Sequence, residues 1–277
     1  MGPDVLRLAG ALQFAVVDAF STRPFGGNPA AVVLLDAPAA DDWREHVAAE
    51  FNLSETAFLR ELGPGRYELR WFTPTTEVRL CGHATLASAH WLWETGVETQ
   101  TLVFATASGQ LRARRGDDGI TLDFPSVPVA EFEPLDGLDE ALGYVDHSYL
   151  GSTAHAEPRE RNAFVLVGAE ALRTFTPDSQ RIGALPVGGL CLTAAGDAEG
   201  VDVLSRYFAP ACGIDEDPVT GSTHCTLAPY WATELGRSRL QARQLSARGG
   251  SLTIEVVNDR VELTGHATTV LDGRLRH

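Results

Sequence analysis

The sequence contains no lysine, because all 22 residues counted as lysine plus arginine are arginine. Without lysine the chain cannot form an internal aldimine with pyridoxal phosphate. It also lacks the lysine of the common phosphate-binding loop. Any carbon-acid chemistry in this protein must therefore proceed without the electron sink that pyridoxal phosphate provides.

Positive charge is scarce as a whole, since the formal net charge is −15. Nucleic-acid binding depends on clustered cations that release counterions from phosphates. The one close basic cluster is Arg112, Arg114 and Arg115, which a solvated strand edge explains better. We therefore expect no nucleic-acid partner.

Long apolar runs are also missing, as no stretch approaches the ~18 residues that a membrane-spanning helix needs. The segment Met1–Arg7 lacks a basic region followed by an apolar run, so it does not read as a leader. Hydrophobic content of 44% and charged content of 21% are typical of a globular protein. We expect a cytoplasmic enzyme with no membrane partner.

Cysteine is sparse and unpatterned. The four residues Cys81, Cys191, Cys212 and Cys225 form no C-x-x-C pair and show no zinc-ligand spacing. Free buried thiols in a reducing compartment are the simplest interpretation. Cys81 stands apart because it directly precedes a glycine that belongs to an internal repeat.

That repeat relates the two halves of the chain. Phe72 and Phe208 lie 136 residues apart, and Gly82 and Gly221 lie 139 apart. Gly109-Gln-Leu111 matches Gly250-Ser-Leu252 at an offset of 141. A drift this slow needs only two small insertions, so the pattern indicates a duplicated domain of about half the chain.

Apolar alternation broken by glycine and proline predicts a strand-rich first half. Acidic residues followed by apolar residues at helical spacing predict a helix over Asp41–Phe51. Cys81–Trp93 is apolar on most sides, which is typical of a helix buried nearly all round. We expect strands at Phe14–Phe20, Ala30–Leu35, Leu53–Leu59, Tyr67–Phe72, Thr101–Phe104, Gly109–Arg114 and Gly119–Phe124.

After a linker at Pro125–Val129, the second half repeats this order. Its buried helix is expected over Ser222–Ala232, and Pro229 should kink that helix or mark a wide first turn. We expect strands at Asn162–Val167, Gly188–Ala194, Val201–Phe208, Gln241–Ala247, Gly250–Val257 and Arg260–Thr264.

Each half places a glycine at the start of its buried helix, Gly82 followed by His83 and Gly221 followed by Ser222. Free N–H groups and a partial positive charge at such ends favour a carboxylate or an oxyanion. If a pseudo-twofold axis brings the two helix starts together, they can bind a small acid between them with few cationic side chains. Thr223 would add a hydrogen-bond donor. Ordinary helix capping explains either glycine taken alone.

Two further polar residues, Glu55 and Asn28, are candidates for the site, and each has two interpretations. Glu55 falls within Leu53–Leu59, and on the pattern alone a solvent-facing strand residue is favoured over a base held in an apolar setting. Asn28 belongs to a Gly-Gly-Asn-Pro turn that either lines a cleft or only shapes the backbone.

Six motifs in order along the chain resemble the PhzF family of phenazine-biosynthesis-like proteins. They are Asp18-Ala-Phe20, Gly27-Asn-Pro-Ala-Ala-Val32, Asn52-Leu-Ser-Glu-Thr-Ala-Phe58, Phe72-Thr-Pro-Thr75, Cys81-Gly-His-Ala-Thr85 and Asp217-Pro-Val-Thr-Gly-Ser222. The resemblance implies an α+β fold of two pseudo-symmetric, diaminopimelate-epimerase-like lobes, each a mostly antiparallel sheet rolled around a central helix. We expect the lobes to be 1–126 and 127–277, and leave open whether the last strand crosses back to the first lobe.

The resemblance also implies a cofactor-free acid/base isomerase, often a homodimer, that acts on a small cyclic carboxylate in the manner of trans-2,3-dihydro-3-hydroxyanthranilate isomerase. It makes Glu55 the acid/base, His83 and Asp217 further catalytic residues, and Ser222 a substrate contact. Gly82 and Gly221 match its substrate-binding backbone amides.

Alternatives remain beside this expectation. Racemases of the same fold use two cysteines, and here Cys81 is matched by Thr220, whose hydroxyl is too weak an acid to replace a thiol. Cys81 is then a small buried filler. A metal held by His83, Asp217 and His224 lacks a supporting motif, so we expect none. A non-catalytic protein that binds a small acid is the third alternative.

Overall fold

The computed structural model describes residues 11–130, 133, 135–155 and 157–276. The segment Met1–Arg7, on which the expectation of no leader depends, lies outside the described residues. The fold is a mixed α+β structure in which strands dominate. None of the described helices combines the length and the apolar character that a bilayer span requires.

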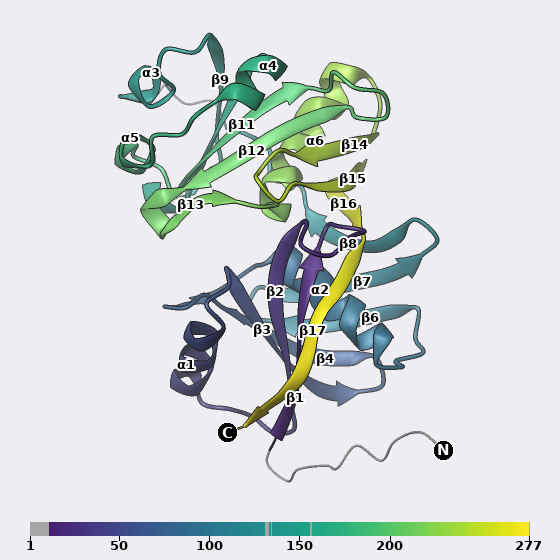
Figure 1. Cartoon of the computed structure of the whole chain (residues 1–277). Helices are drawn as coiled ribbons and strands as arrows, with labels where there is room; N and C mark the ends of the chain where they lie inside the picture. Colours follow the sequence, from purple (N-terminus) through teal and green to yellow (C-terminus); the bar gives the residue numbers. More distant parts are fainter. Residues whose placement is uncertain (1–10, 131–132, 134, 156, 277) are drawn as a thin grey trace.

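Figure 1 shows the chain as a lower and an upper part, and the lower part is built mainly from the first half of the sequence. Its helices are α1 (Asp41–Phe51) and α2 (Gly82–Glu94). Its strands are β1 (Ala11–Ala19), β2 (Asn28–Leu35), β3 (Glu55–Gly63), β4 (Arg66–Phe72), β5 (Glu77–Val78), β6 (Thr101–Thr106), β7 (Gly109–Gly116) and β8 (Gly119–Pro125).

The upper part holds most of the second half. Its helices are α3 (Leu138–Ala141), α4 (Ala169–Thr174), α5 (Ser179–Ala184) and α6 (Gly221–Leu235), with 3-10 turns at Pro158–Glu160 and Pro210–Cys212. Its strands are β9 (His147–Ser152), β10 (Asn162–Val167), β11 (Gly189–Ala195), β12 (Val203–Ala209), β13 (Ile214–Asp217), β14 (Arg239–Gln244), β15 (Gly250–Val257) and β16 (Arg260–Gly265).

The strand pairing follows the same order in both halves. In the first half β2–β3 is parallel, β3–β4 antiparallel, β4–β6 parallel and β6–β7 antiparallel. In the second half β10–β11 is parallel, β11–β12 antiparallel, β12–β14 parallel and β14–β15 antiparallel. Each parallel crossover between β4 and β6, or between β12 and β14, contains the buried helix that the sequence predicts.

Two ladders join the parts. β8 pairs antiparallel with β16, from Ile120 opposite Gly265 to Pro125 opposite Arg260. The final strand β17 (Ala267–Arg276) runs antiparallel beside β1 over the whole length of β1. Figure 1 shows β17, in yellow, descending from β16 across the lower part. The boundary near residue 126 stays a prediction.

The two central helices match their predicted positions. α2 begins one residue after the predicted start and is buried at nearly every position, including Thr85 and Ser88, whose hydroxyls donate to carbonyls one turn earlier. α6 continues through Pro229 to Leu235. Proline has no N–H to donate to the carbonyl of Cys225. That carbonyl instead accepts from the N–H of Val127, in the linker between the halves.

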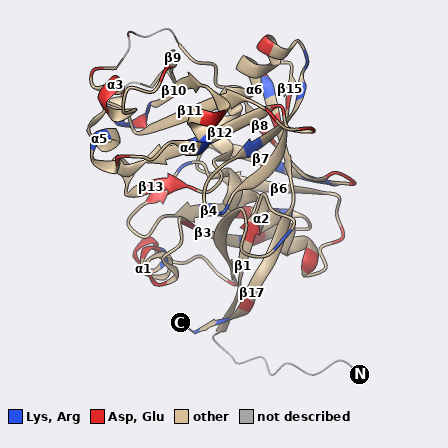
Figure 2. Cartoon of the chain, turned by 45° about the horizontal axis from the view of Figure 1, so that its top comes forward, with Lys and Arg blue, Asp and Glu red and all other residues tan. Residues whose placement is uncertain are grey.

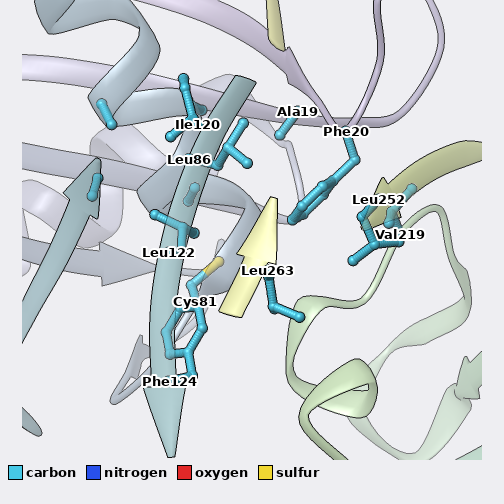
Figure 3. Packing of buried hydrophobic residues seen from close by; sticks show 14 of the residues in the cluster. Ala19, Phe20, Cys81, Leu86, Ile120, Leu122, Phe124, Val219, Leu252 and Leu263 are labelled. Carbon is cyan, nitrogen blue, oxygen red and sulfur yellow. The ribbon is translucent and has the colours of Figure 1, made fainter. Parts of the chain in front are cut away.

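The largest apolar cluster extends over both halves. Phe20 and Leu86 from the first half belong to it together with Val219, Leu252 and Leu263 from the second (Figure 3). Because these side chains share one cluster, separating the halves would expose apolar surface to water. The free-energy cost would be about 25 cal/mol for each Å² exposed. The cluster therefore fixes how the starts of α2 and α6 are placed.

Gly27 closes the loop between β1 and β2 in a conformation that excludes a side chain. Its φ is +63°, and a Cβ there would lie 2.0 Å from the carbonyl oxygen of Ala19. Its N–H donates to the carbonyl of Gly249 at 2.7 Å, so the loop is tied to the second half. The next residue is Asn28, and the position of that side chain depends on this turn.

We expect Gly27→Ala to lower the free energy of unfolding by about 3 kcal/mol or more, since it adds a backbone clash to left-handed strain. Gly236→Ala is the matched control, because Gly236 has φ +64° but open space around it. This control should lose only about 1–2 kcal/mol. Urea unfolding measures both, and equal losses would contradict the role assigned to the Ala19 contact.

Candidate active site

A cavity of about 170 Å³ lies where the starts of α2 and α6 meet. Pockets that take drug-sized ligands begin near ~300 Å³, so this one suits a smaller molecule. No described lysine or arginine lines it. The lining consists of Glu55, Leu80, Cys81, Gly82, His83, Tyr207, Ala209, Cys212, Ile214, Asp217, Thr220, Gly221 and Ser222.

Glu55 is the first residue of β3, and its side chain is only 14% exposed. The solvent-facing interpretation favoured by the pattern alone is therefore wrong. β3 lies between β2 and β4, and Thr56, Ala57, Phe58 and Leu59 are all buried. Since both faces of this strand segment are covered, alternation no longer separates inward from outward residues.

The carboxyl of Glu55 is held in an environment that disfavours its charge. Burial, followed by the nearby charge of Asp217, raises the pKa of Glu55 to about 8, and a contact with Cys81 opposes this shift. Its Oε2 atom is buried and accepts no hydrogen bond from a described residue, although His83 Nε2 lies 3.2 Å away. Buried polar atoms are rarely left unpaired, so Oε2 of this cavity-lining residue indicates a place for a ligand. Oδ1 of Asn28 is also buried without a partner among the described residues, but Asn28 is not among the lining residues.

His83 lies beside this carboxyl. Its Nε2 is 3.2 Å from Glu55 Oε2, and its Nδ1 is 3.5 Å from the sulfur of Cys81. Burial lowers the pKa of His83 to about 3. The imidazole is therefore neutral at neutral pH, and it offers one donor and one acceptor rather than a charge.

Asp217 ends β13 and is held by the first half of the chain. Its Oδ1 accepts from the Asn28 amide at 2.9 Å, and its Oδ2 accepts from the Thr220 hydroxyl. The same Asn28 nitrogen donates to the carbonyl of Val219 at 2.9 Å and lies 3.3 Å from His83 Nδ1. Burial raises the pKa of Asp217, while its hydrogen bonds from Thr220 and Asn28 lower it. Asn28 thus stands between the aspartate and the imidazole.

The glycines at the helix starts face one another. A Cβ built on Gly82 would lie 3.4 Å from the Cα of Gly221. Neither helix start has a hydrogen bond to its N-cap side chain. Both helices exceed three turns, and their partial positive ends converge on one cavity. The arrangement is able to bind a carboxylate without a cationic side chain.

Some predicted site residues lie apart from the cavity. The Thr223 hydroxyl donates to the carbonyl of Thr220, and Thr223 is not among the described lining residues. His224 contacts Ser205 and the Thr220 carbonyl, so the metal set of His83, Asp217 and His224 is not assembled.

A different trio could offer ligand atoms to a metal. One donor atom each from Glu55, Cys81 and His83 lie within 4.8 Å of one another. A metal bound there would occupy the space beside the Glu55 carboxyl.

Sequence reasoning missed several residues of this site. Tyr207 and Cys212 line the cavity, and Gln244 is bonded to two of the lining residues. The Gln244 side chain is fully buried, accepts from the Thr220 N–H at 2.9 Å and donates to the Asp217 carbonyl at 2.7 Å. The available signal was its place on the inward face of its strand, where it follows Leu240 and Ala242 at alternate positions.

The sheet-dominated fold is similar to that of proteins with the epimerase fold. A hydroxyproline epimerase from Agrobacterium vitis shares this fold at a TM-score of 0.64 with 15% identity, covering 96% of this chain and 91% of that one. The family profile described as phenazine biosynthesis-like protein matches residues 17–273. The chain belongs to that family, PhzC-PhzF.

Individual relatives agree over nearly the full length. A protein from Pseudomonas aeruginosa named as an uncharacterized isomerase is 47% identical over 266 residues, which cover 96% of this chain and 98% of the relative. The crystal structure of a PhzF-family phenazine biosynthesis protein from Enterococcus faecalis is 38% identical, with a TM-score of 0.87. That alignment covers 96% of this chain and all of the other.

Replacing Glu55 should change how stability depends on pH. With a folded-state pKa of about 8 against an ordinary 4.5, the folded protein binds more protons than the unfolded chain between these values, and stability falls as pH rises through them. Glu55→Gln removes this loss. We expect the unfolding free energy of the variant, relative to that of the wild type, to increase between pH 5 and pH 9 by at most about 5 kcal/mol.

Urea unfolding at several pH values measures this gain, with the exposed Glu50→Gln of α1 as the matched control. A Glu55→Gln difference that stays constant with pH would show that the native carboxyl is not desolvated.

Proposed function

We propose that this protein is a cofactor-independent isomerase that moves a proton, and with it a double bond, in a small cyclic carboxylate, in the manner of trans-2,3-dihydro-3-hydroxyanthranilate isomerase. One observation carries the proposal: the Glu55 carboxyl lines the cavity with a buried oxygen that accepts no hydrogen bond from a described residue, and it has a pKa of about 8. Such a group changes its protonation state near neutral pH and can both accept and return a proton.

The reaction balances with this one residue. The Glu55 carboxylate removes a proton from a substrate carbon, and the electron pair of that C–H bond forms a new C=C bond. The electrons of the existing C=C bond shift to its far carbon, which takes the proton back from Glu55. No electrons leave the substrate, so the step needs no oxidant or cofactor.

The remaining site residues hold the substrate and its developing charge. The uncapped amides after Gly82 and Gly221 bind the carboxylate, and their partial positive charge stabilises negative charge that spreads into it during proton removal. Neutral His83 and Asp217 orient the ring, and Asn28 holds Asp217 in place from outside the cavity lining. Ser222, exposed at the start of α6, adds a hydroxyl.

We also infer that the two halves are pseudo-symmetric lobes. The repeated order of parallel and antiparallel pairings supports this, as do two buried helices that each start with a glycine. Duplication explains why the cavity has one helix start on either side. It does not require equivalent chemistry, since Glu55 belongs to the first half and Asp217 to the second.

The test is exchange of the migrating proton in deuterium oxide with trans-2,3-dihydro-3-hydroxyanthranilate as the probe. The wild type should give isomerised, deuterated product, and Glu55→Gln should be slower by about 10²–10⁴, as is usual for loss of a general acid/base. If proton removal limits the rate, kcat/KM should rise with pH and level off near the pKa of about 8. Full exchange by Glu55→Gln would remove the mechanism.

Cys81→Ser separates this reaction from amino-acid racemisation, the main enzymatic alternative. Burial and the charge of Glu55 raise the pKa of the Cys81 thiol well above its ordinary value, which opposes a thiolate base. Opposite it, the Thr220 hydroxyl is already bonded to Asp217. We expect Cys81→Ser to keep most of the isomerase activity. Binding of the probe without any exchange would favour a non-catalytic binding protein.

A further inference from the structure

A second cavity, of about 280 Å³, lies at another junction of the two halves and shares no lining residue with the first. Its walls come from the loop after β1, from β14, from the turn before β15 and from the residue between β16 and β17. Three arginines, Arg23, Arg243 and Arg248, line it together with His266. No described aspartate or glutamate is among its lining residues.

Two of these guanidinium groups are uncommitted. Arg23 and Arg243 are exposed, and their side chains form no ion pair or hydrogen bond with any residue that the structure describes. Arg248 donates from Nη2 to Asp18 Oδ1 at 2.6 Å and from Nε to the carbonyl of Gly27 at 2.8 Å. Its Nη1 has no partner among the described residues. With Asp18 compensating Arg248, the cavity keeps an excess of two positive charges.

The backbone around these arginines is fixed across the halves. The Ser21 N–H donates to the carbonyl of His266 at 3.1 Å, and the Ser251 N–H donates to that of Phe20 at 3.1 Å. The Ser21 hydroxyl also bonds to both backbone groups of Arg23. Because the backbone is already ordered, a ligand in this cavity need order only the arginine side chains.

The charge of the whole protein makes this concentration of arginine unusual. The net charge is −15, and Figure 2 shows acidic residues on α1, α3 and β13, well spread over the molecule. An overall negative protein repels anions unless local cations focus the field inside a cavity. Free guanidinium groups converging from both halves provide such a focus, and their planar forks match the oxygens of phosphate and carboxylate groups.

We propose that this cavity binds a small multivalent oxyanion, either a phosphate-bearing molecule or a di- or tricarboxylate, between Arg23, Arg243 and Nη1 of Arg248. The site is distinct from the isomerase site, where the carboxylate meets backbone amides only. Thr22 and Ser251 also line the cavity, and their hydroxyls can supply neutral donors. Two free guanidinium groups favour a ligand with at least two negative charges over a monoanion.

Isothermal titration of the full-length protein with pyrophosphate and, separately, with citrate tests the proposal at constant ionic strength held by chloride. We expect saturable 1:1 binding of at least one probe with a Kd of about 1 mM or tighter. Stronger binding of pyrophosphate would identify a phosphate ligand, and stronger binding of citrate a polycarboxylate. The readout needs no turnover, so it is independent of whether the isomerase proposal holds.

The double variant Arg23→Ala with Arg243→Ala should weaken that binding by about tenfold or more, since it removes both free guanidinium groups that would donate charge-assisted hydrogen bonds to the ligand. Arg112→Ala with Arg115→Ala is the matched control, because it removes two exposed, unpaired arginines from β7. The single variant Arg243→Gln is a milder change that should leave the fold intact, and it should show a smaller loss of binding. Absence of saturable binding, or equal weakening in the control, would overturn the proposal.

Discussion

The burial of one carboxyl group, that of Glu55, is the constraint on which the rest of this structure depends. Burying a carboxyl group in a small cavity costs free energy, because the group loses its contacts with water. The rest of the fold must therefore be stable enough to hold it there. That cost is met by the large apolar cluster shared between the halves, which holds the starts of α2 and α6 against each other. The core and the reactive group are thus parts of one arrangement.

The absence of lysine and the use of backbone amides have a common physical logic. A cation beside Glu55 would stabilise its ionised form and lower its pKa. Helix N-termini give a partial positive charge that is directed along the helix axis and adds no titrating group. Under the proposed function, the cavity can therefore bind an anion while Glu55 keeps its raised pKa. The paired glycines leave room for this because neither carries a side chain into the space between the helices.

Both buried helices and most strands could be predicted from glycine spacing and apolar periodicity. The position of Glu55 could not be predicted from alternation, because alternation reports burial only in strands with one open face. Its role was suggested by the motif around it instead. Asn28 and Asp217 are 189 residues apart, and their pairing depends on the Gly27 turn and on the contact between halves. Local sequence holds no record of such a contact, and for the same reason the place of Tyr207 in the cavity lining could not be predicted.

The return of β17 to β1 also affects how the chain folds during synthesis. β1 has β2 on one side, but its other edge is completed only by residues 267–276. A ribosome must make nearly all of this sequence before that edge can be paired. Until then β1 presents open hydrogen-bonding groups of the kind that promote association between nascent chains. The lower part, although it emerges first, can therefore be completed only after residues 267–276 have been made.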